Sequence, residues 1–247
     1  GSDQAMNAEA WTTEAFPATE GRRWMFALPM DVNEDGNLDL VIGAKNQKAI
    51  VGWLEHPGVE AVRDAAAWKL HAMTDAGWIM SLRSVDLDED GDQDILFSDR
   101  YEDRRGVYWI ENPGADSDAQ RGEWKRQLIG GAGRHVMFLT AGDLNADDRD
   151  DIVCATLEGD LLIYMATETG WTESIEPLPF GLTAGKGVAI ADVNLDGRAD
   201  IVTTSEAQRE ADDMVSVAWK EQTADGGWID HAISDDRGRK FDRIEMI

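Results

Sequence analysis

Four short acidic stretches recur along this 247-residue chain and limit what it can fold into. Each has an Asp or Asn at positions 1, 3, 5 and 9, and three of the four have Gly at position 6. They begin at Asp31, Asp86, Asp143 and Asp192, so their spacings are 55, 57 and 49 residues. One such stretch is an ordinary polar turn, but four at a near-constant spacing indicate a repeated structural unit.

The oxygen-bearing side chains of these stretches predict calcium sites. Ca²⁺ takes roughly six to eight oxygen ligands. A tight loop can direct positions 1, 3 and 5 to one centre, while the carbonyl of position 7 and the side chain of position 9 complete the shell. Gly at position 6 permits the positive φ that bends the loop back. We therefore predict about four Ca²⁺ ions, held by Asp31, Asn33, Asp35, Asn37 and Asp39; by Asp86, Asp88, Asp90, Asp92 and Asp94; by Asp143, Asn145, Asp147, Arg149 and Asp151; and by Asp192, Asn194, Asp196, Arg198 and Asp200.

The stretches differ from EF-hand loops in two respects. An EF-hand requires a bidentate Glu at position 12, where this chain has Ile42, Phe97, Cys154 and Thr203. The flanking segments are also rich in β-branched residues, which favours strands rather than helices. The pattern therefore predicts calcium-binding β-hairpins.

A longer repeat surrounds each loop. Strands that start with Trp precede the loops, and a later strand in three copies carries Trp-x-Glu. Four strands in each unit of about 50 residues indicate an all-β fold, a β-propeller of four-stranded blades. Because they recur at fixed repeat positions, most of the Trp residues are expected to pack between blades. The Trp-led strands start at Trp11, Trp68, Trp124, Trp171 and Trp228, and the Trp-x-Glu strands contain Trp53, Trp109 and Trp219.

We expect a single propeller domain over residues 1–247, with repeats over 11–57, 68–113, 124–166 and 171–221 and a partial repeat over 228–247. The last copy stops one residue before its own loop would begin. Four full blades and a partial fifth are therefore expected. They form four and a half blades of a larger ring of five to seven blades, whose chain continues, or a five-bladed ring that closes irregularly.

The Asp-x-Asn-x-Asp-Gly-x-x-Asp loop, followed by endings such as Trp109-Ile-Glu-Asn-Pro113, resembles the FG-GAP/VCBS repeat family. The resemblance covers essentially the whole chain and implies an integrin-α-like propeller with calcium sites on hairpins at one rim. Members include adhesion modules, lectins and polysaccharide lyases, so the resemblance implies a fold more than an activity. The third loop departs from the pattern at Asp148, which tolerates a left-handed conformation at a cost of about 1 kcal/mol. We expect that site to be the weakest.

The charge of the chain excludes several classes of partner. A formal net charge of −26 disfavours nucleic acid and anionic membranes, and no apolar run approaches the length of a membrane span. Cys154 is the only cysteine, so no internal disulfide can form. Because loops of this kind bind calcium in the low-affinity range of extracellular modules, we expect a secreted, periplasmic or cell-surface protein.

Two other sets of loops are expected at the rim opposite the calcium hairpins, and they hold more than half of the 23 Lys and Arg residues. A cationic rim with aromatic side chains suggests an anionic ligand such as a uronate or sulfated glycan, because Arg binds carboxylate and sulfate with paired hydrogen bonds. Loops of any soluble protein also collect charges, and acids such as Asp99 and Glu102 dilute this rim. The candidate ligand-binding residues are Arg23, Trp78, Arg100, Tyr101, Arg134, His135 and Lys186.

These features favour a non-enzymatic recognition or adhesion module for carbohydrate or for an extracellular protein partner. The alternative is a polysaccharide lyase on the same scaffold. In that enzyme Arg134 would neutralise a uronate, His135 or Tyr101 would take the C5 proton, and the leaving oxygen would be protonated. A third possibility is a fragment of a larger adhesin whose partner site lies elsewhere.

Overall fold

The computed structural model describes residues 12–114, 117–206, 215–234 and 244, and its sixteen strands form four separate four-stranded antiparallel sheets. The first sheet contains β1 (Arg23–Met30), β2 (Asp39–Lys45), β3 (Ile50–Glu55) and β4 (Lys69–Asp75). The second contains β5 (Ile79–Val85), β6 (Asp94–Asp99), β7 (Gly106–Ile110) and β8 (Arg126–Gly130). The third contains β9 (Val136–Gly142), β10 (Asp151–Thr156), β11 (Asp160–Thr167) and β12 (Gly170–Pro177). The fourth contains β13 (Gly185–Ala191), β14 (Asp200–Ser205), β15 (Val217–Gln222) and β16 (Trp228–Ala232).

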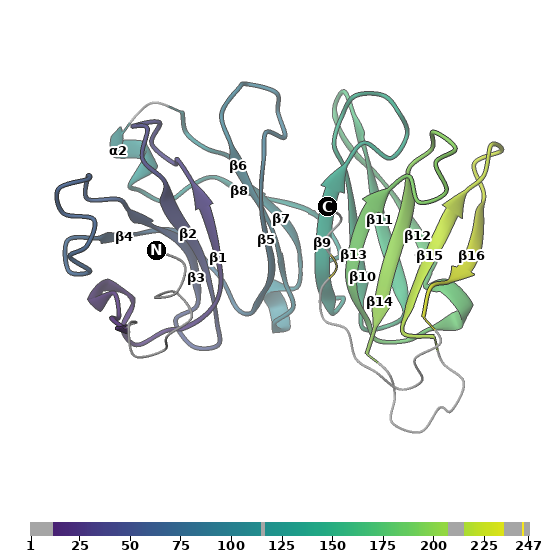
Figure 1. Cartoon of the computed structure of the whole chain (residues 1–247), viewed down its shortest axis with the longest axis horizontal. Helices are drawn as coiled ribbons and strands as arrows, with labels where there is room; N and C mark the ends of the chain where they lie inside the picture. Colours follow the sequence, from purple (N-terminus) through teal and green to yellow (C-terminus); the bar gives the residue numbers. More distant parts are fainter. Residues whose placement is uncertain (1–11, 115–116, 207–214, 235–243, 245–247) are drawn as a thin grey trace, which may run out of the picture.

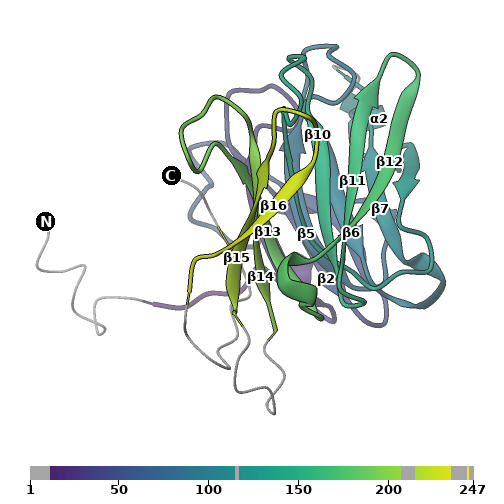
Figure 2. The same cartoon turned by 90° about the vertical axis from the view of Figure 1, so that its right-hand side faces the viewer.

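Each sheet is a meander whose first strand faces the middle of the molecule. The first strands of successive sheets contact one another, β1 with β5, β5 with β9 and β9 with β13. The four sheets therefore follow one another side by side along the molecule (Figure 1), with the fourth sheet facing the viewer in Figure 2. This arrangement is that of propeller blades and confirms the predicted all-β fold class. Short helical turns lie in the connections, namely η2 (Pro17–Thr19), η3 (Glu102–Arg104), α2 (Ser117–Gln120) and η4 (Pro179–Gly181).

The sequence repeat and the sheet are offset by one strand. Each strand that follows a repeated Trp is the outermost strand of the preceding sheet, as β4 pairs with β3. Trp228–Ala232 accordingly completes the fourth sheet as β16 and does not begin a fifth. Residues 12–16 lie in no strand, and Trp11 lies outside the described residues, as does most of the predicted fifth copy.

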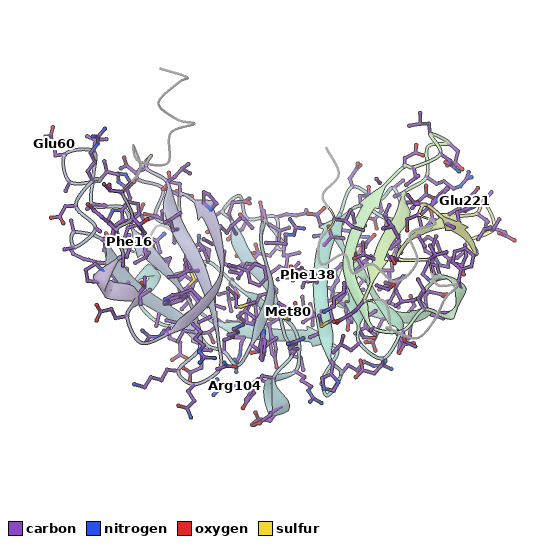
Figure 3. All side chains as sticks on the ribbon, turned by 60° about the horizontal axis from the view of Figure 1, so that its bottom comes forward. Phe16, Glu60, Met80, Arg104, Phe138 and Glu221 are labelled. Carbon is purple, nitrogen blue, oxygen red and sulfur yellow. The ribbon has the colours of Figure 1, made fainter. Side chains whose placement is uncertain are left out.

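The centre of the molecule is narrow and filled by side chains. Phe26 of β1 and Phe138 of β9 meet edge to face with ring centroids 6.2 Å apart. Figure 3 shows Phe138 near Met80 of β5 in the middle of the molecule. A cavity of about 70 Å³ here is lined by all four inner strands and by Ile244. In the repeat register, Ile244 corresponds to four residues that also line this cavity, Ala27, Leu82, Leu139 and Val188.

The main cores lie between the sheets rather than within one of them. Ile95 and Phe97 of β6 pack toward the first sheet, whereas Leu96 packs toward the third. A strand that is covered on both faces has apolar residues at successive positions, because neither side-chain direction meets water. This explains why the second strand of each sheet is largely apolar. Cys154 is fully buried in such a strand, and burial raises the pKa of its thiol to about 12. No helix among the described residues has the length and apolar character needed to cross a membrane.

Candidate functional site

The four acidic loops connect the first and second strands of each sheet and lie at one end of the molecule, the upper edge of Figure 1. Position 6 has a positive φ in all four, as predicted, including φ 65° at Asp148. The sequence did not indicate that position 4 is also left-handed. Its φ values are 57° to 61° although none of these residues is Gly; they are Glu34, Glu89, Ala146 and Leu195.

The first Asp of each loop folds the loop around its own carboxylate. In the first loop the backbone N–H groups of Asp35 and Gly36 donate to the two oxygens of Asp31, at 3.1 and 2.9 Å. A bond from the N–H of position 6 to the carboxylate of position 1 occurs in all four loops. The other three run from Gly91 to Asp86, from Asp148 to Asp143 and from Gly197 to Asp192.

The last Asp of each loop is buried and ties the loop to the sheet. Both of its oxygens accept backbone N–H groups, one from position 2 of the loop and one from a residue near the end of the third strand, at most two residues beyond it. The donors are Val32 and His56 for Asp39, Leu87 and Asn112 for Asp94, Leu144 and Ala166 for Asp151, and Val193 and Gln222 for Asp200. Burial raises the pKa of Asp39 and Asp94 to about 6. These residues therefore have a structural role besides their predicted role as metal ligands.

The second loop gathers the densest set of carboxylates. Oxygens of Asp86, Asp88 and Asp90 lie within 4.8 Å of one another and could hold a metal ion. Burial and then repulsion by Asp90 raise the pKa of Asp88. Burial, Asp90 and Asp88 raise that of Asp92 to about 6. One oxygen each of Asp86 and Asp92 is buried without a hydrogen-bond partner among the described residues. A hard divalent cation would satisfy these oxygens and relieve their repulsion.

The third and fourth loops carry their own cation. Arg149 Nη2 lies 2.7 Å from Oδ2 of Asp147, and Arg198 pairs in the same way with Asp196. The bond from Arg149 lowers the pKa of Asp147. Position 7 was predicted to supply a backbone carbonyl. In these two loops the Arg side chain at position 7 also forms an ion pair with the Asp at position 5. A metal ion bound by that Asp would therefore compete with the guanidinium.

These features define a β-propeller protein with an acidic hairpin loop in every blade. The FG-GAP-like repeat matches residues 31–97, 86–154 and 143–203, and the chain belongs to this repeat family. Each match runs from the first residue of one loop to position 12 of the next, so the matches link all four loops. No protein with a curated description matches the chain.

At the opposite rim the structure fixes Trp78 between the first two sheets. The buried carboxylate of Asp99 accepts the N–H groups of Gly77 at 2.6 Å, Trp78 at 2.8 Å and Tyr101 at 3.0 Å. On the other side Trp78 forms a β-bridge with Lys45. The turn that carries the indole is therefore held by backbone contacts from both sheets.

Two cations contact this indole, and a third lies beside one of them. Arg100 Cζ lies 4.1 Å and Lys45 Nζ 4.8 Å from the centroid of the Trp78 ring. Arg23 is the cross-strand neighbour of Lys45. We call Arg23, Lys45, Trp78 and Arg100 the Trp78 cluster. Sequence reasoning placed Lys45 in a loop of this rim but not among the candidate ligand-binding residues; the β-bridge identifies it as a neighbour of Trp78.

The other predicted ligand-binding residues already have anionic partners. Arg134 pairs with Asp160 at 2.6 Å, His135 with Glu158 at 2.8 Å and Lys186 with Glu206 at 2.8 Å. Tyr101 is exposed, and a hydrogen bond with Glu102 raises its pKa. The three lyase candidates are thus each engaged with a nearby carboxylate.

Proposed function

We propose that this protein is a calcium-binding, non-enzymatic recognition module, secreted or exposed at the cell surface, that binds an anionic carbohydrate at the Trp78 cluster. The observation that carries the proposal is the charge of this cluster. None of its three cations forms an ion pair with a described carboxylate, although the chain has a net charge of −26. Like charges held together on an acidic protein favour an anionic ligand.

The Trp78 indole holds the side chains of Lys45 and Arg100 in place before such a ligand binds. Cation–π contacts are worth about 0.5–1 kcal/mol each at exposed sites and restrict the rotamers of the cationic side chains. The guanidinium of Arg100 can then donate two parallel hydrogen bonds to a carboxylate or sulfate with little further loss of side-chain conformational entropy. Burial lowers the pKa of Arg100, and the nearby Glu206 opposes this shift. A bound anion would likewise favour the charged guanidinium.

Calcium has a structural role in this proposal. Clustered carboxylates in the loops repel one another until a cation binds. If each loop binds at about 0.1 mM, millimolar calcium stabilises the fold by roughly 1.4 kcal/mol per site. The loops lie at the end of the sheets opposite η3, so the metal would stabilise the blades without touching the ligand.

A panel of uronate-containing, sulfated and neutral polysaccharides tests the proposal. Binding and the ultraviolet absorbance of unsaturated uronate are recorded together in calcium. We expect binding to the anionic members without rising absorbance. Rising absorbance would identify a lyase, and preference for neutral polysaccharides would contradict the assignment of the Trp78 cluster.

A further inference from the structure

A groove of about 480 Å³ lies between the second and third sheets, beside the second acidic loop. Trp109, Gln127 and Ile129 of the second sheet and Trp171 of the third sheet line it. Trp109 and Trp171 are each partly exposed. A groove of this size with two indoles is large enough for a ligand.

The neighbouring interface, between the first and second sheets, shows how the same position is filled. Trp53 and Trp124 occupy the repeat positions of Trp109 and Trp171, but they are only 0% and 3% exposed. The segment of α2 lies over them, and the main-chain carbonyl of Gln120 accepts both indole N–H groups, at 3.2 and 2.9 Å. The next residue, Arg121, pairs with Glu55 at 2.5 Å.

The third sheet has no such segment. The connection that forms α2 in the second sheet is reduced to the turn Thr167–Gly170, where Thr167 Oγ1 donates to the carbonyl of Gly170. The indole nitrogen of Trp109 is buried beside the carboxylate of Asp94, so the groove meets the partly exposed ring of Trp109 rather than its N–H group. The groove therefore has the two indoles but lacks the polypeptide segment that covers the equivalent indoles between the first and second sheets.

The charge around the groove indicates what would bind. Among the described residues, five carboxylates and one guanidinium line it, and that guanidinium, of Arg149, is already paired with Asp147. A divalent ion in the second loop would neutralise two of the five and leave an acidic surface. The lining carboxylates are Asp86, Asp88, Glu89, Asp150 and Glu168.

We propose that this groove binds a basic polypeptide segment of a partner protein, which lies where the α2 segment lies in the neighbouring interface. The segment packs on the partly exposed rings of Trp109 and Trp171, and Lys or Arg side chains beside it pair with Asp150 and Glu168. This site is separate from the Trp78 cluster and would bind a different class of ligand.

Synthetic peptides test the proposal on the whole chain in calcium. The probe is acetyl-Lys-Ser-Ala-Gln-Arg-Gly-Lys-amide, whose Gln-Arg-Gly copies residues 120–122. Its acidic counterpart has Glu in place of every Lys and Arg. Indole N–H signals in ¹H–¹⁵N spectra report binding, and the Trp109 signal is assigned by its loss in Trp109→Phe. We expect the basic peptide to shift the Trp109 and Trp171 signals and the acidic peptide to bind at least tenfold more weakly.

Two sets of variants separate the groove from the fold. Trp109→Phe keeps an aromatic ring but reduces the ring surface on which the segment packs, so we expect about fivefold weaker binding. Trp219→Phe changes the same repeat position in the fourth sheet, outside the groove, and should bind as the wild type does. Glu168→Gln, on an exposed turn, should weaken binding about threefold at low salt and change nothing at high salt.

Three results would overturn the proposal. The first is equal binding of the basic and acidic peptides, and the second is a basic peptide that leaves the Trp109 and Trp171 signals unmoved. The third is a neutral oligosaccharide that shifts these two signals when the basic peptide does not, which would make the groove a sugar site.

Discussion

The guanidinium of Arg100 lies over the ring of Trp78, with 4.1 Å between Cζ and the ring centroid. Lys45 approaches the same ring to 4.8 Å, so two cations share one indole without an intervening carboxylate. Arg134, on the same rim, instead lies 2.6 Å from Asp160. This contrast separates a cation available to a ligand from one that the protein has already neutralised.

Arg100→Gln is expected to weaken the binding of an anionic polysaccharide about tenfold, because a charge-assisted hydrogen bond contributes roughly 1.5–3 kcal/mol. Arg134→Gln serves as the matched control and should change affinity less than twofold, since its charge is paired. Titration calorimetry in calcium measures both. Equal losses from the two variants would show that the rim attracts the ligand only through its overall charge.

Two acids of the second loop are expected to differ in chelator. Asp94 accepts two backbone N–H groups, so Asp94→Asn should lower the free energy of unfolding by about 2 kcal/mol even without calcium. Asp88 lies in the repelling triad, so Asp88→Asn should leave the apo stability unchanged or raised and should weaken calcium binding. Urea unfolding with and without calcium separates the two effects. The reverse pattern would exchange their roles.

Removing an internal competitor should strengthen the fourth calcium site. Arg198 pairs with the carboxylate of Asp196, which a metal ion would also need. We expect Arg198→Gln to tighten calcium binding at this loop about fivefold, as followed by the backbone amide shift of Gly197. Arg63→Gln, on an exposed turn, is the control. A weaker fourth site in Arg198→Gln would mean that the guanidinium orients the loop rather than competes.

Glu55 is expected to make the apo protein sensitive to acid. Its bond with Arg121, and then that with His71, lowers its pKa from 4.5 to about 2 against the opposing effect of burial. Since the folded pKa lies below the unfolded one, the stabilisation is complete above pH 4.5 and is lost as the pH falls toward 2. In chelator, Glu55→Gln should cost about 2 kcal/mol at pH 6, and this difference should shrink by pH 3.

Glu60→Gln controls for the loss of one negative charge, because Glu60 lies exposed in a turn at the far end of the first sheet (Figure 3). Urea midpoints across the pH range provide the measurement. A constant difference between Glu55→Gln and the wild type would contradict the assigned shift.

The blade architecture could be predicted from the sequence because its signals are local and repeated. The loop pattern, the positive φ at position 6 and the four strands of each unit all lie within one repeat. The hydrogen bond that joins each loop to the end of the third strand could not be predicted from the sequence, because its partners, such as Asp39 and His56, are far apart in the chain. The left-handed position 4 has no compositional signature, because Glu, Ala and Leu all occur there.

The sites depend on contacts between repeats, and here sequence reasoning was less complete. Trp78 lies on the predicted rim, and its role in ligand binding stays a prediction; its neighbour Lys45 lies in another blade. Most of the repeated Trp residues were expected to pack between blades. Trp53 is buried and Trp109 is not, because the α2 segment covers only one of the two interfaces. An insertion in a single repeat thus decides which interface stays open.

Calorimetric melting of the protein in 2 mM calcium and in EGTA tests the calcium-binding loops most directly. Four sites of roughly 1.4 kcal/mol each, at about 2–4 °C per kcal/mol for a domain of this size, predict a midpoint at least 10 °C higher in calcium. Magnesium at the same concentration should raise it much less, because it demands a smaller octahedral site. An unchanged midpoint in calcium would contradict the assignment of all four loops as calcium sites.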